Sequence, residues 1–366
     1  MSTSTHIITT SEFAGWMSQL GDFELVSNHK IAVAVSGGAD SMALLLLAND
    51  FAKQTNCEIT AITINHKLRV EAVDEAKQVA VWCAKQNIEH HIINWNFSQK
   101  PTSAIQETAR NARYQLLTDF CKKNAVKNLL VAHHGDDQIE TFFFRLARGS
   151  GLLGLAGMSA KARIYGVNLL RPLLLAPKKR LVATLQEKNQ PWIEDPSNQN
   201  TDYTRVRIRQ HLQIFLSNDK NRARTMQLIE KFGKFRMVME KQIANELAKN
   251  VEISNENSAV LDMCEKISEP AISHLVKILS GKEHSPRTEK MQRFYPKLYE
   301  KSEKKLSFNG LLFKPTKEEK IIIYHEKENA KNIKFSAKML AASGFWSMNN
   351  SSNNSVVRHC EQSEAI

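Results

Sequence analysis

Between Lys30 and Ala147 the chain alternates short apolar runs with longer runs in which apolar residues recur every three or four positions. The short runs predict β-strands, and the longer periodic runs predict amphipathic helices. The predicted order is strand 31–35, helix 39–54, strand 58–65, helix 71–87, strand 89–95, helix 102–125, strand 128–132 and helix 136–147. Strands that alternate with helices form parallel sheets with right-handed crossovers. The expected fold class is therefore α/β, with a doubly wound parallel sheet.

Beyond residue 148 the pattern is less regular. The expected segments are a glycine-rich loop over the ligand site at 149–157, a basic connector at 169–217, helices at 222–249, 269–280 and 287–300, and a small β-hairpin of 306–313 and 320–325 around a turn at 314–316. The tail at 347–366 is rich in Ser and Asn and is expected to be disordered. The predicted domains are residues 1–215, a helical domain at 216–300 and a small β-containing C-terminal module at 301–346.

The net charge of +12 over 366 residues is unevenly distributed. Residues 145–215 contain twelve Lys or Arg and four Asp or Glu, whereas residues 1–144 have a net charge of about −3. A local excess of Lys and Arg favours a polyanionic partner, because these side chains neutralise phosphates. A solvated basic surface is the alternative that charge alone leaves open.

No segment suggests a membrane or secreted protein. The longest strongly apolar run, Met42–Ala48, is too short to span a bilayer, and no basic residue precedes an apolar segment in Met1–Thr10. The five cysteines form no C-x-x-C pair, which argues against a disulfide framework and against a zinc or iron-sulfur site. We therefore expect a cytoplasmic protein, whose oligomeric state the sequence leaves open.

A glycine turn joins the first predicted strand to the first predicted helix. Its residues are Ser36, Gly37, Gly38, Ala39, Asp40 and Ser41. The glycines allow a sharp turn that exposes backbone N–H groups, and the positive end of the helix dipole lies at the same place. We expect this turn to bind a pyrophosphate-type anion, with Asp40 holding the accompanying Mg²⁺. It is neither a Walker A loop nor G-x-G-x-x-G, and an ordinary tight βα turn is the alternative.

A second polar cluster follows the fourth predicted strand. It begins with His133 and His134, and Asp137 and Glu140 then share one face of the first helical turn. Paired carboxylates at a ligand site can hold an ammonium group or a metal ion. Capping of the helix N-terminus is the alternative, and we expect it to explain Asp136.

Ordered motifs resemble known families. The S-G-G-x-D-S turn resembles that of PP-loop ATP pyrophosphatases, which have an adenine nucleotide alpha-hydrolase-like fold. The run from His133 to Thr141 resembles the H-H-x-D-D-Q-x-E-T signature of the tRNA(Ile)-lysidine synthetase family. Further matching segments, in chain order, are His66-Lys67-Leu68-Arg69, Ala109–Tyr114, Leu146–Gly151 and Trp192–Asn198. The chain is similar to that family from residue 31 to about residue 215.

The resemblance implies an enzyme, a carbon-nitrogen ligase that modifies the wobble cytidine of an isoleucine tRNA with a CAU anticodon. ATP adenylates the C2 oxygen of the base, free L-lysine displaces AMP, and lysidine results. Residues 1–215 would then form the ATP-binding catalytic domain with its basic connector, and residues 216–300 a tRNA-binding domain.

The same resemblance implies roles for individual residues. Ser36–Ser41 and His66 would bind ATP, and Asp40 would support Mg²⁺. Arg113 would stabilise the charge that develops during adenylation. Asp137 and Glu140 would bind the incoming lysine, and His133 is a candidate acceptor for the proton of its amine.

Basic residues are the expected contacts to the tRNA. They are Arg145, Arg148 and Arg171, which would border the crevice, and Arg205, Arg207 and Arg209 in the connector. Local salt bridges are the alternative for the last three. Two other functions stay open: a PP-loop tRNA thiolase, for which the C-x-x-C pair is missing, and a non-catalytic RNA-binding protein on a nucleotide-binding scaffold.

Overall fold

The computed structural model describes residues 6–21, 30–65, 71–95, 105–194, 212, 215–255, 258–282, 285–300 and 304–326. The chain divides into two compact units, Met1–Lys234 and Phe235–Ile366. In the part of the chain that the structure describes, no helix has the length and apolar character that crossing a membrane requires. The predicted tail at 347–366 lies outside the described residues.

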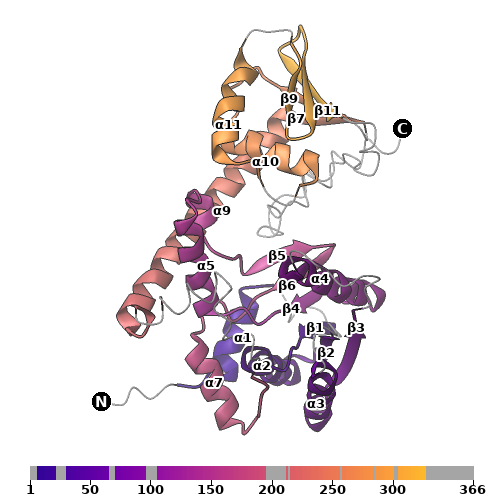
Figure 1. The fold of residues 1–366 in the computed structure, drawn as a ribbon, viewed down its shortest axis with the longest axis vertical. Coiled ribbons are helices and arrows are strands. Elements are labelled where there is room, and N and C mark those ends of the chain that lie inside the picture. The colour runs from indigo at the N-terminus through magenta and orange to yellow at the C-terminus, as the bar shows by residue number, and fades with distance from the viewer. Residues whose placement is uncertain are drawn as a thin grey trace. The chain divides into compact units, whose positions relative to one another are not determined.

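The first unit is built on a six-stranded sheet of order β3-β2-β1-β4-β6-β5 (Figure 1). Its strands are β1 (Lys30–Ala34), β2 (Glu58–Asn65), β3 (Glu89–Asn94), β4 (Asn128–Leu130), β5 (Lys161–Ile164) and β6 (Val167–Leu170). All neighbouring pairs are parallel except β5 and β6, which form an antiparallel pair at one edge. The order reverses between β1 and β4, so the sheet is doubly wound and the predicted fold class is confirmed.

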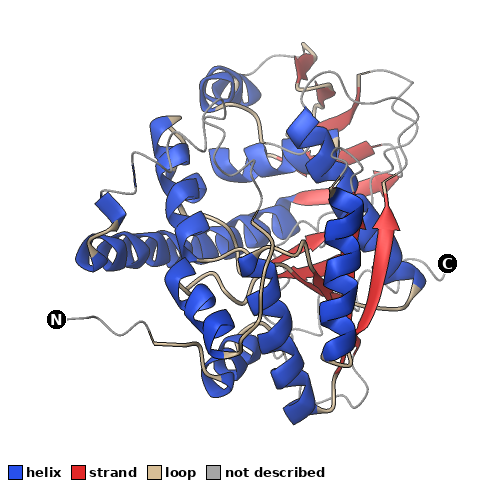
Figure 2. Cartoon of the chain, turned by 60° about the horizontal axis from the view of Figure 1, so that its bottom comes forward, coloured by secondary structure: helices blue, strands red, loops and turns tan. Residues whose placement is uncertain are grey.

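Helices cover both faces of this sheet (Figure 2). The helices of this unit are α1 (Thr10–Ser18), α2 (Ala39–Thr55), α3 (Ala72–Lys85), α4 (Ile105–Lys123), α5 (Gly135–Ala147), α6 (Leu152–Leu155) and α7 (Lys178–Glu187). Buried residues of α5 and α6 form a separate cluster with Leu216 and Ile229. Alternate residues of β1 point to opposite faces: Ile31 and Val33 pack in the core with α1, α2, α3 and α7, whereas Ala32 packs in the core with α4. Both faces of β1 are buried, which explains its unbroken apolar sequence.

The eight elements predicted between residues 31 and 147 are all present, with ends that differ by up to three residues. Five other elements of this unit are additions to the prediction, and α1 is one of them. The glycine-rich segment expected to be a loop contains the one-turn helix α6, and the connector contains α7 and the second half of β6. Strands β5 and β6 are only four residues long, and a turn at Tyr165–Gly166 joins them, so neither gave a clear periodic signal.

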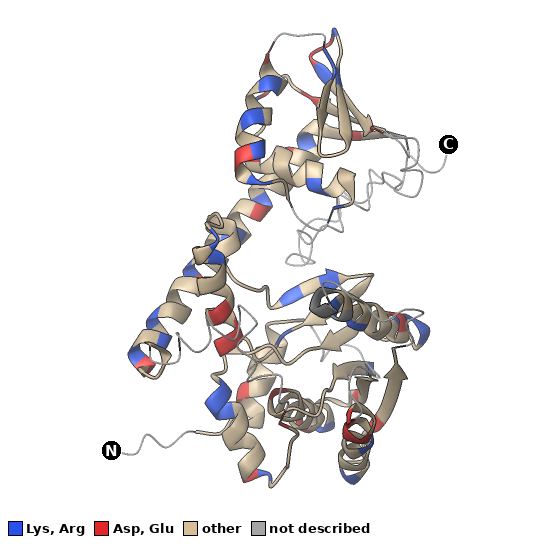
Figure 3. Cartoon of the chain, in the orientation of Figure 1, with Lys and Arg blue, Asp and Glu red and all other residues tan. Residues whose placement is uncertain are grey.

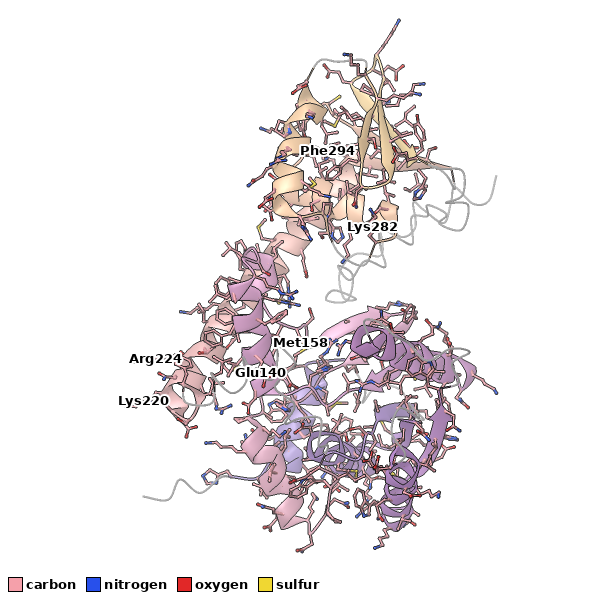
Figure 4. The ribbon with its side chains drawn as sticks, viewed as in Figure 1. Glu140, Met158, Lys220, Arg224, Lys282 and Phe294 are labelled. Atoms are coloured by element: carbon pink, nitrogen blue, oxygen red, sulfur yellow. The ribbon has the colours of Figure 1, made fainter. Side chains whose placement is uncertain are left out.

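The second unit contains a separate antiparallel sheet of order β7-β8-β11-β10-β9. Its elements are β7 (Val251–Asn255), β8 (Ser258–Asp262), α10 (Glu269–Ser280), α11 (Thr288–Phe294), the 3-10 helix η2 (Tyr295–Tyr299), β9 (Leu306–Phe308), β10 (Leu311–Pro315) and β11 (Lys320–His325). Helix α9 (Asp219–Asn250) belongs to both units. Phe294 lies in the core of the second unit, with its ring stacked 4.0 Å from that of Phe308 (Figure 4).

The predicted C-terminal hairpin is part of this five-stranded sheet. Residues Asn309 and Gly310 have positive φ angles and divide the predicted strand 306–313 into β9 and β10. Strands β7 and β8 were not predicted, and they share the sheet with residues 306–325. The domain boundaries expected at 215 and 300 stay predictions.

Candidate active site

The loops that follow β1 and β4 leave the carboxyl ends of two adjacent parallel strands. This is the point at which the strand order reverses, and ligands of doubly wound sheets bind in the crevice at such a point. The glycine turn follows β1, and the histidine pair follows β4. The fold therefore brings the two motifs together although about 95 residues separate them in the sequence.

The glycine turn has a conformation that requires glycine at its centre. Gly37 has a φ of +86°, and a Cβ atom there would lie 2.7 Å from Cδ1 of Ile193. The backbone N–H of Ile193 donates to the carbonyl of Gly37 at 2.9 Å, so the segment after α7 packs directly on the turn. Gly38 has ordinary backbone angles, and a Cβ atom there would make only ordinary van der Waals contacts, the nearest at 3.7 Å from Oγ of Ser36.

Hydrogen bonds within the turn fix its shape. The Ser41 hydroxyl accepts from the N–H of Ser36 at 3.1 Å and donates to the carbonyl of Gly38 at 2.9 Å. Gly38 is the N-cap of α2 and supplies no side-chain cap. The first N–H groups of a helix without a side-chain cap are available to an anion, which the helix dipole also favours. This arrangement suits the phosphates of a nucleotide.

Asp40 lies at the centre of the site. Its Oδ2 atom is 3.5 Å from Nε2 of His134 and 3.6 Å from Nζ of Lys178, which stands at the start of α7. Burial alone would raise the pKa of Asp40, but His134 and Lys178 outweigh it and the pKa is lowered. Asp40 is therefore ionised at neutral pH.

The other carboxylate oxygen of Asp40 fits a metal ion. Oδ1 is buried and has no hydrogen-bond partner in the described part of the chain. Mg²⁺ bound with a nucleotide commonly takes one or two protein carboxylates in addition to phosphate oxygens and water. No group of three or more His, Cys, Asp or Glu side chains that could hold a metal ion occurs among the described residues. Asp40 alone thus meets the requirement for Mg²⁺ that arrives with a nucleotide.

Helix α5 begins with a capping box formed by His134 and Asp137. The ring Nδ1 of His134 accepts from the N–H of Asp137 at 3.4 Å, and the carboxylate of Asp137 accepts from the N–H of His134 at 3.1 Å. Asp136 stands in the first turn of α5, as the capping interpretation expects, and it also forms an ion pair with Arg222 on α9. A histidine as N-cap explains why the sequence did not indicate this arrangement.

The two carboxylates predicted to share a face of α5 stand three residues apart near its start, and Asp137 contacts His134. Asp137 is partly exposed and Glu140 is half-buried (Figure 4). Gly135 begins the helix in close contact with the chain before α7, where a Cβ atom would lie 3.0 Å from the carbonyl oxygen of Ala176. Acidic residues therefore mark the start of α5 and basic residues the start of α7 (Figure 3).

His133 lies close to positively charged side chains, and Arg113 is one of them. Burial is the main cause that lowers the pKa of His133 to about 3, and the charges of Arg171, Arg110 and Arg113 contribute. The guanidinium groups of Arg110 and Arg113 lie 5.1 and 5.5 Å from the ring centroid of Tyr114. His133 is consequently neutral at physiological pH and a weaker base than the sequence suggested.

The arginines expected to contact tRNA differ in environment. Arg148 is exposed and lies over the ring of Phe144. Arg145 donates to the carbonyls of Gly154 and Gly157, so it holds the glycine-rich segment in place. Arg171 is only 8% exposed and lies inside the site, which does not fit the predicted contact with a tRNA backbone. His66, Arg205, Arg207 and Arg209 lie outside the described residues.

Comparison with known proteins agrees with this geometry. A family model described as the PP-loop domain matches residues 10–215. The tRNA(Ile)-lysidine synthase of Rickettsia bellii is 33% identical over 308 residues, which cover 81% of this chain and 70% of that protein. The chain belongs to the tRNA(Ile)-lysidine synthase family.

Other relatives of this family match over shorter regions. The tRNA(Ile)-lysidine synthase of Orientia tsutsugamushi is 39% identical over 215 residues, which are 59% of this chain and 48% of that protein. The chain spans about half the length of such curated relatives. The fold of a U34-tRNA thiolase from Methanococcus maripaludis is similar with a TM-score of 0.53 and 17% identity, over 62% of this chain and 78% of that one. This last similarity concerns the fold alone.

Three residues that make contacts around the candidate site were not identified from the sequence. They are Lys178, which pairs with Asp40; Arg222, which pairs with Asp136; and Gln138, whose amide exchanges two hydrogen bonds with the backbone of Met158. All three act across elements far apart in the chain. A short-range motif contains no signal for such pairs.

Proposed function

We propose that this protein ligates L-lysine to C2 of the wobble cytidine in an isoleucine tRNA with a CAU anticodon. The reaction would proceed through a cytidine adenylated at its C2 oxygen, with pyrophosphate leaving in the first step and AMP in the second. Membership of the tRNA(Ile)-lysidine synthase family supports this proposal. We further propose that the protein acts in the cytoplasm, with residues 1–215 as the catalytic domain and residues 216–300 contacting the tRNA.

One observation carries the proposal. The glycine turn that suits phosphates and the acidic start of α5 meet at the strand-order reversal, where His134 contacts both Asp40 and Asp137. An enzyme that adenylates one substrate and then joins an amine to it needs two such sites next to each other. The phosphates of ATP would occupy the turn at 36–41, and the lysine amine would lie near Asp137 and Glu140.

The residues of the first half-site suit adenylation. The backbone N–H groups at the start of α2 would hold phosphate oxygens, together with the side chain of Ser36. Mg²⁺, held by Asp40, would supply neutralisation of charge on the departing pyrophosphate. Arg113 would stabilise negative charge during the attack by the cytidine oxygen, a role that its positive charge close to His133 supports.

The second half-site must bind lysine and remove a proton. An attacking amine is neutral, so a nearby group has to accept its proton. His133 is a poor candidate because its pKa is about 3. We therefore favour Asp137 or Glu140 as the acceptor, since both stand on the face of α5 at the crevice.

Contacts with the tRNA are proposed for four basic residues. Arg148 is exposed at the C-cap of α5, and Arg205, Arg207 and Arg209 belong to the connector. Each lost phosphate contact should weaken tRNA binding for all sequences alike and reduce its dependence on salt.

Radiolabelled lysine incorporation tests the proposal directly. The full chain with Mg²⁺ and ATP should label the CAU-anticodon tRNA and release one pyrophosphate for each lysine, whereas a tRNA with another wobble base should give neither. Asp137→Ala should abolish labelling. A chain that transfers sulfur would instead indicate a thiolase, and a chain that binds tRNA without pyrophosphate release would indicate a binding protein. Either result contradicts the proposed function.

A further inference from the structure

Three arginines surround His133 at the carboxyl ends of β4 and β6. Arg171 directly follows β6, and Arg110 and Arg113 stand three residues apart on α4. The charges of all three act on His133, and two of them lie over the ring of Tyr114. We call Arg110, Arg113 and Arg171 the arginine cluster.

The described part of the chain provides no negative charge for this cluster. Burial lowers the pKa of Arg171, and the side chain of Tyr114 is its polar neighbour. Among the described residues, the buried Nε atoms of Arg113 and Arg171 have no hydrogen-bond partner. A buried guanidinium donor without a partner is costly, so the Nε atoms of Arg113 and Arg171 point to a bound anion, whereas Arg110 is exposed and adds charge at the rim of the cluster.

The cluster is separate from the phosphate turn. Strand β6 lies two positions from β1 in the sheet, which corresponds to about 10 Å across the strands. The turn at 36–41 has its own donors, the N–H groups at the start of α2. An anion held at Arg171 is therefore a second one, next to the acidic face of α5 that follows β4.

The proposed substrate brings such an anion. Free lysine has two amines and one carboxylate, and the carboxylate stays charged whichever amine attacks. Asp137 and Glu140 suit an ammonium group and would repel a carboxylate. We propose that the arginine cluster, with Arg171 as the main contact, is the subsite for the carboxylate of the amino-acid substrate. This inference rests on the proposed function and adds the group that selects an amino acid over a simple amine.

Arg171 is well placed for this role. Its side chain is 8% exposed, and its Nη1 donates to the carbonyl of Ser159 at 2.7 Å, which fixes the plane of the guanidinium. A guanidinium held in this way can direct its remaining N–H groups at a carboxylate, and bidentate pairing gives strong and geometrically selective binding.

Amine selectivity of the unaltered protein tests the subsite without any mutation. Three amines are compared as substrates. They are L-lysine, L-lysinamide, in which a neutral amide replaces the carboxylate, and 1,5-diaminopentane, which has no carboxylate. We expect kcat/KM for lysine to exceed that for either analogue by about tenfold or more. Equal values with intact pyrophosphate release overturn the subsite alone, whereas absence of tRNA-dependent pyrophosphate release contradicts the proposed function itself.

Substitution of Arg171 then locates the subsite. Arg171→Gln should raise KM for lysine about tenfold and leave that for lysinamide unchanged, and Arg171→Lys should retain part of the selectivity. Arg163→Gln, which removes the same charge from an exposed position on β5, is the matched control and should change neither KM. An equal loss for lysine and lysinamide would indicate a packing role, and a raised KM for ATP or tRNA would indicate a phosphate. Both results overturn the proposal.

Discussion

The Nε2 atom of His134 lies 3.5 Å from Oδ2 of Asp40, although the two residues belong to loops that follow different strands. The opposite ring nitrogen accepts from the N–H of Asp137 at 3.4 Å. One ring, 3% exposed, therefore connects the metal-binding carboxylate proposed for adenylation with the helix that carries the proposed lysine site. A shift of either half-site would be transmitted to the other through His134.

His134→Ala should lower both activity and stability. Loss of the N-cap costs about 1 kcal/mol in the free energy of unfolding. Loss of the group that orients Asp40 should lower kcat for pyrophosphate release about tenfold to hundredfold, as substitutions of groups that orient metal-bound residues do. The exposed His91, which pairs with Glu89, supplies the control variant His91→Ala. If the His134→Ala variant is less stable but has an unchanged kcat, His134 only caps the helix and does not orient Asp40.

Gly37→Ala and Gly38→Ala form a matched pair at the phosphate turn. The backbone at Gly37 has a positive φ, which a residue with a Cβ atom rarely adopts, and the Cβ atom would lie 2.7 Å from Ile193. A Cβ atom at Gly38 would have no neighbour closer than 3.7 Å. Thermal unfolding should show that Gly37→Ala lowers the free energy of unfolding by about 1–3 kcal/mol and that Gly38→Ala lowers it by less than half of that. Ile193→Ala added to Gly37→Ala should recover only the part due to the clash. Equal costs for the two single variants would contradict this account.

Local patterns predicted the first half of the fold because each element there has a strong signal of its own. Strand β1 is buried on both faces, and α2 presents buried residues from Ser41 to Asn49, so apolar runs mark both. The glycine turn and the pair Asp137 and Glu140 were likewise found from spacing, because their residues are neighbours in sequence. The fold class and the positions of both motifs at one sheet edge followed from the alternation of strands and helices.

The contacts between distant elements could not be predicted in the same way. Lys178 and Arg222 reach the site from α7 and α9, and no spacing rule connects them with Asp40 or Asp136. The burial of Arg171 was also missed, because an arginine after a short strand has the same sequence pattern whether it points outward or inward. Strand β5 has four residues, of which Lys161 and Arg163 are charged, so it lacks the apolar run that marks β1.

The ion pair between Asp136 and Arg222 should position α5 for the proposed lysine site. Arg222 also donates to the carbonyl of Leu216 at 3.2 Å, so it links the first turn of α5 to the chain before α9. Arg222→Gln should raise KM for lysine several-fold and leave KM for ATP unchanged, because Asp137 adjoins the pair. A double-mutant cycle with Asp136→Asn should give a coupling free energy of about 1–2 kcal/mol. Additive effects of the two substitutions would exclude the coupling.

His133→Gln should make the protein less sensitive to acid. Burial foremost, and then the neighbouring arginines and His134, lower the pKa of His133 to about 3 in the folded state. As the pH falls below about 6.5 the unfolded ring takes up a proton and the folded ring does not, so folding stability is lost down to the folded pKa. Between pH 7.5 and 5.5 the wild type should therefore lose on the order of 1 kcal/mol more than the variant. Urea unfolding of both proteins at the two pH values measures the difference, and equal losses would show that His133 is not held neutral.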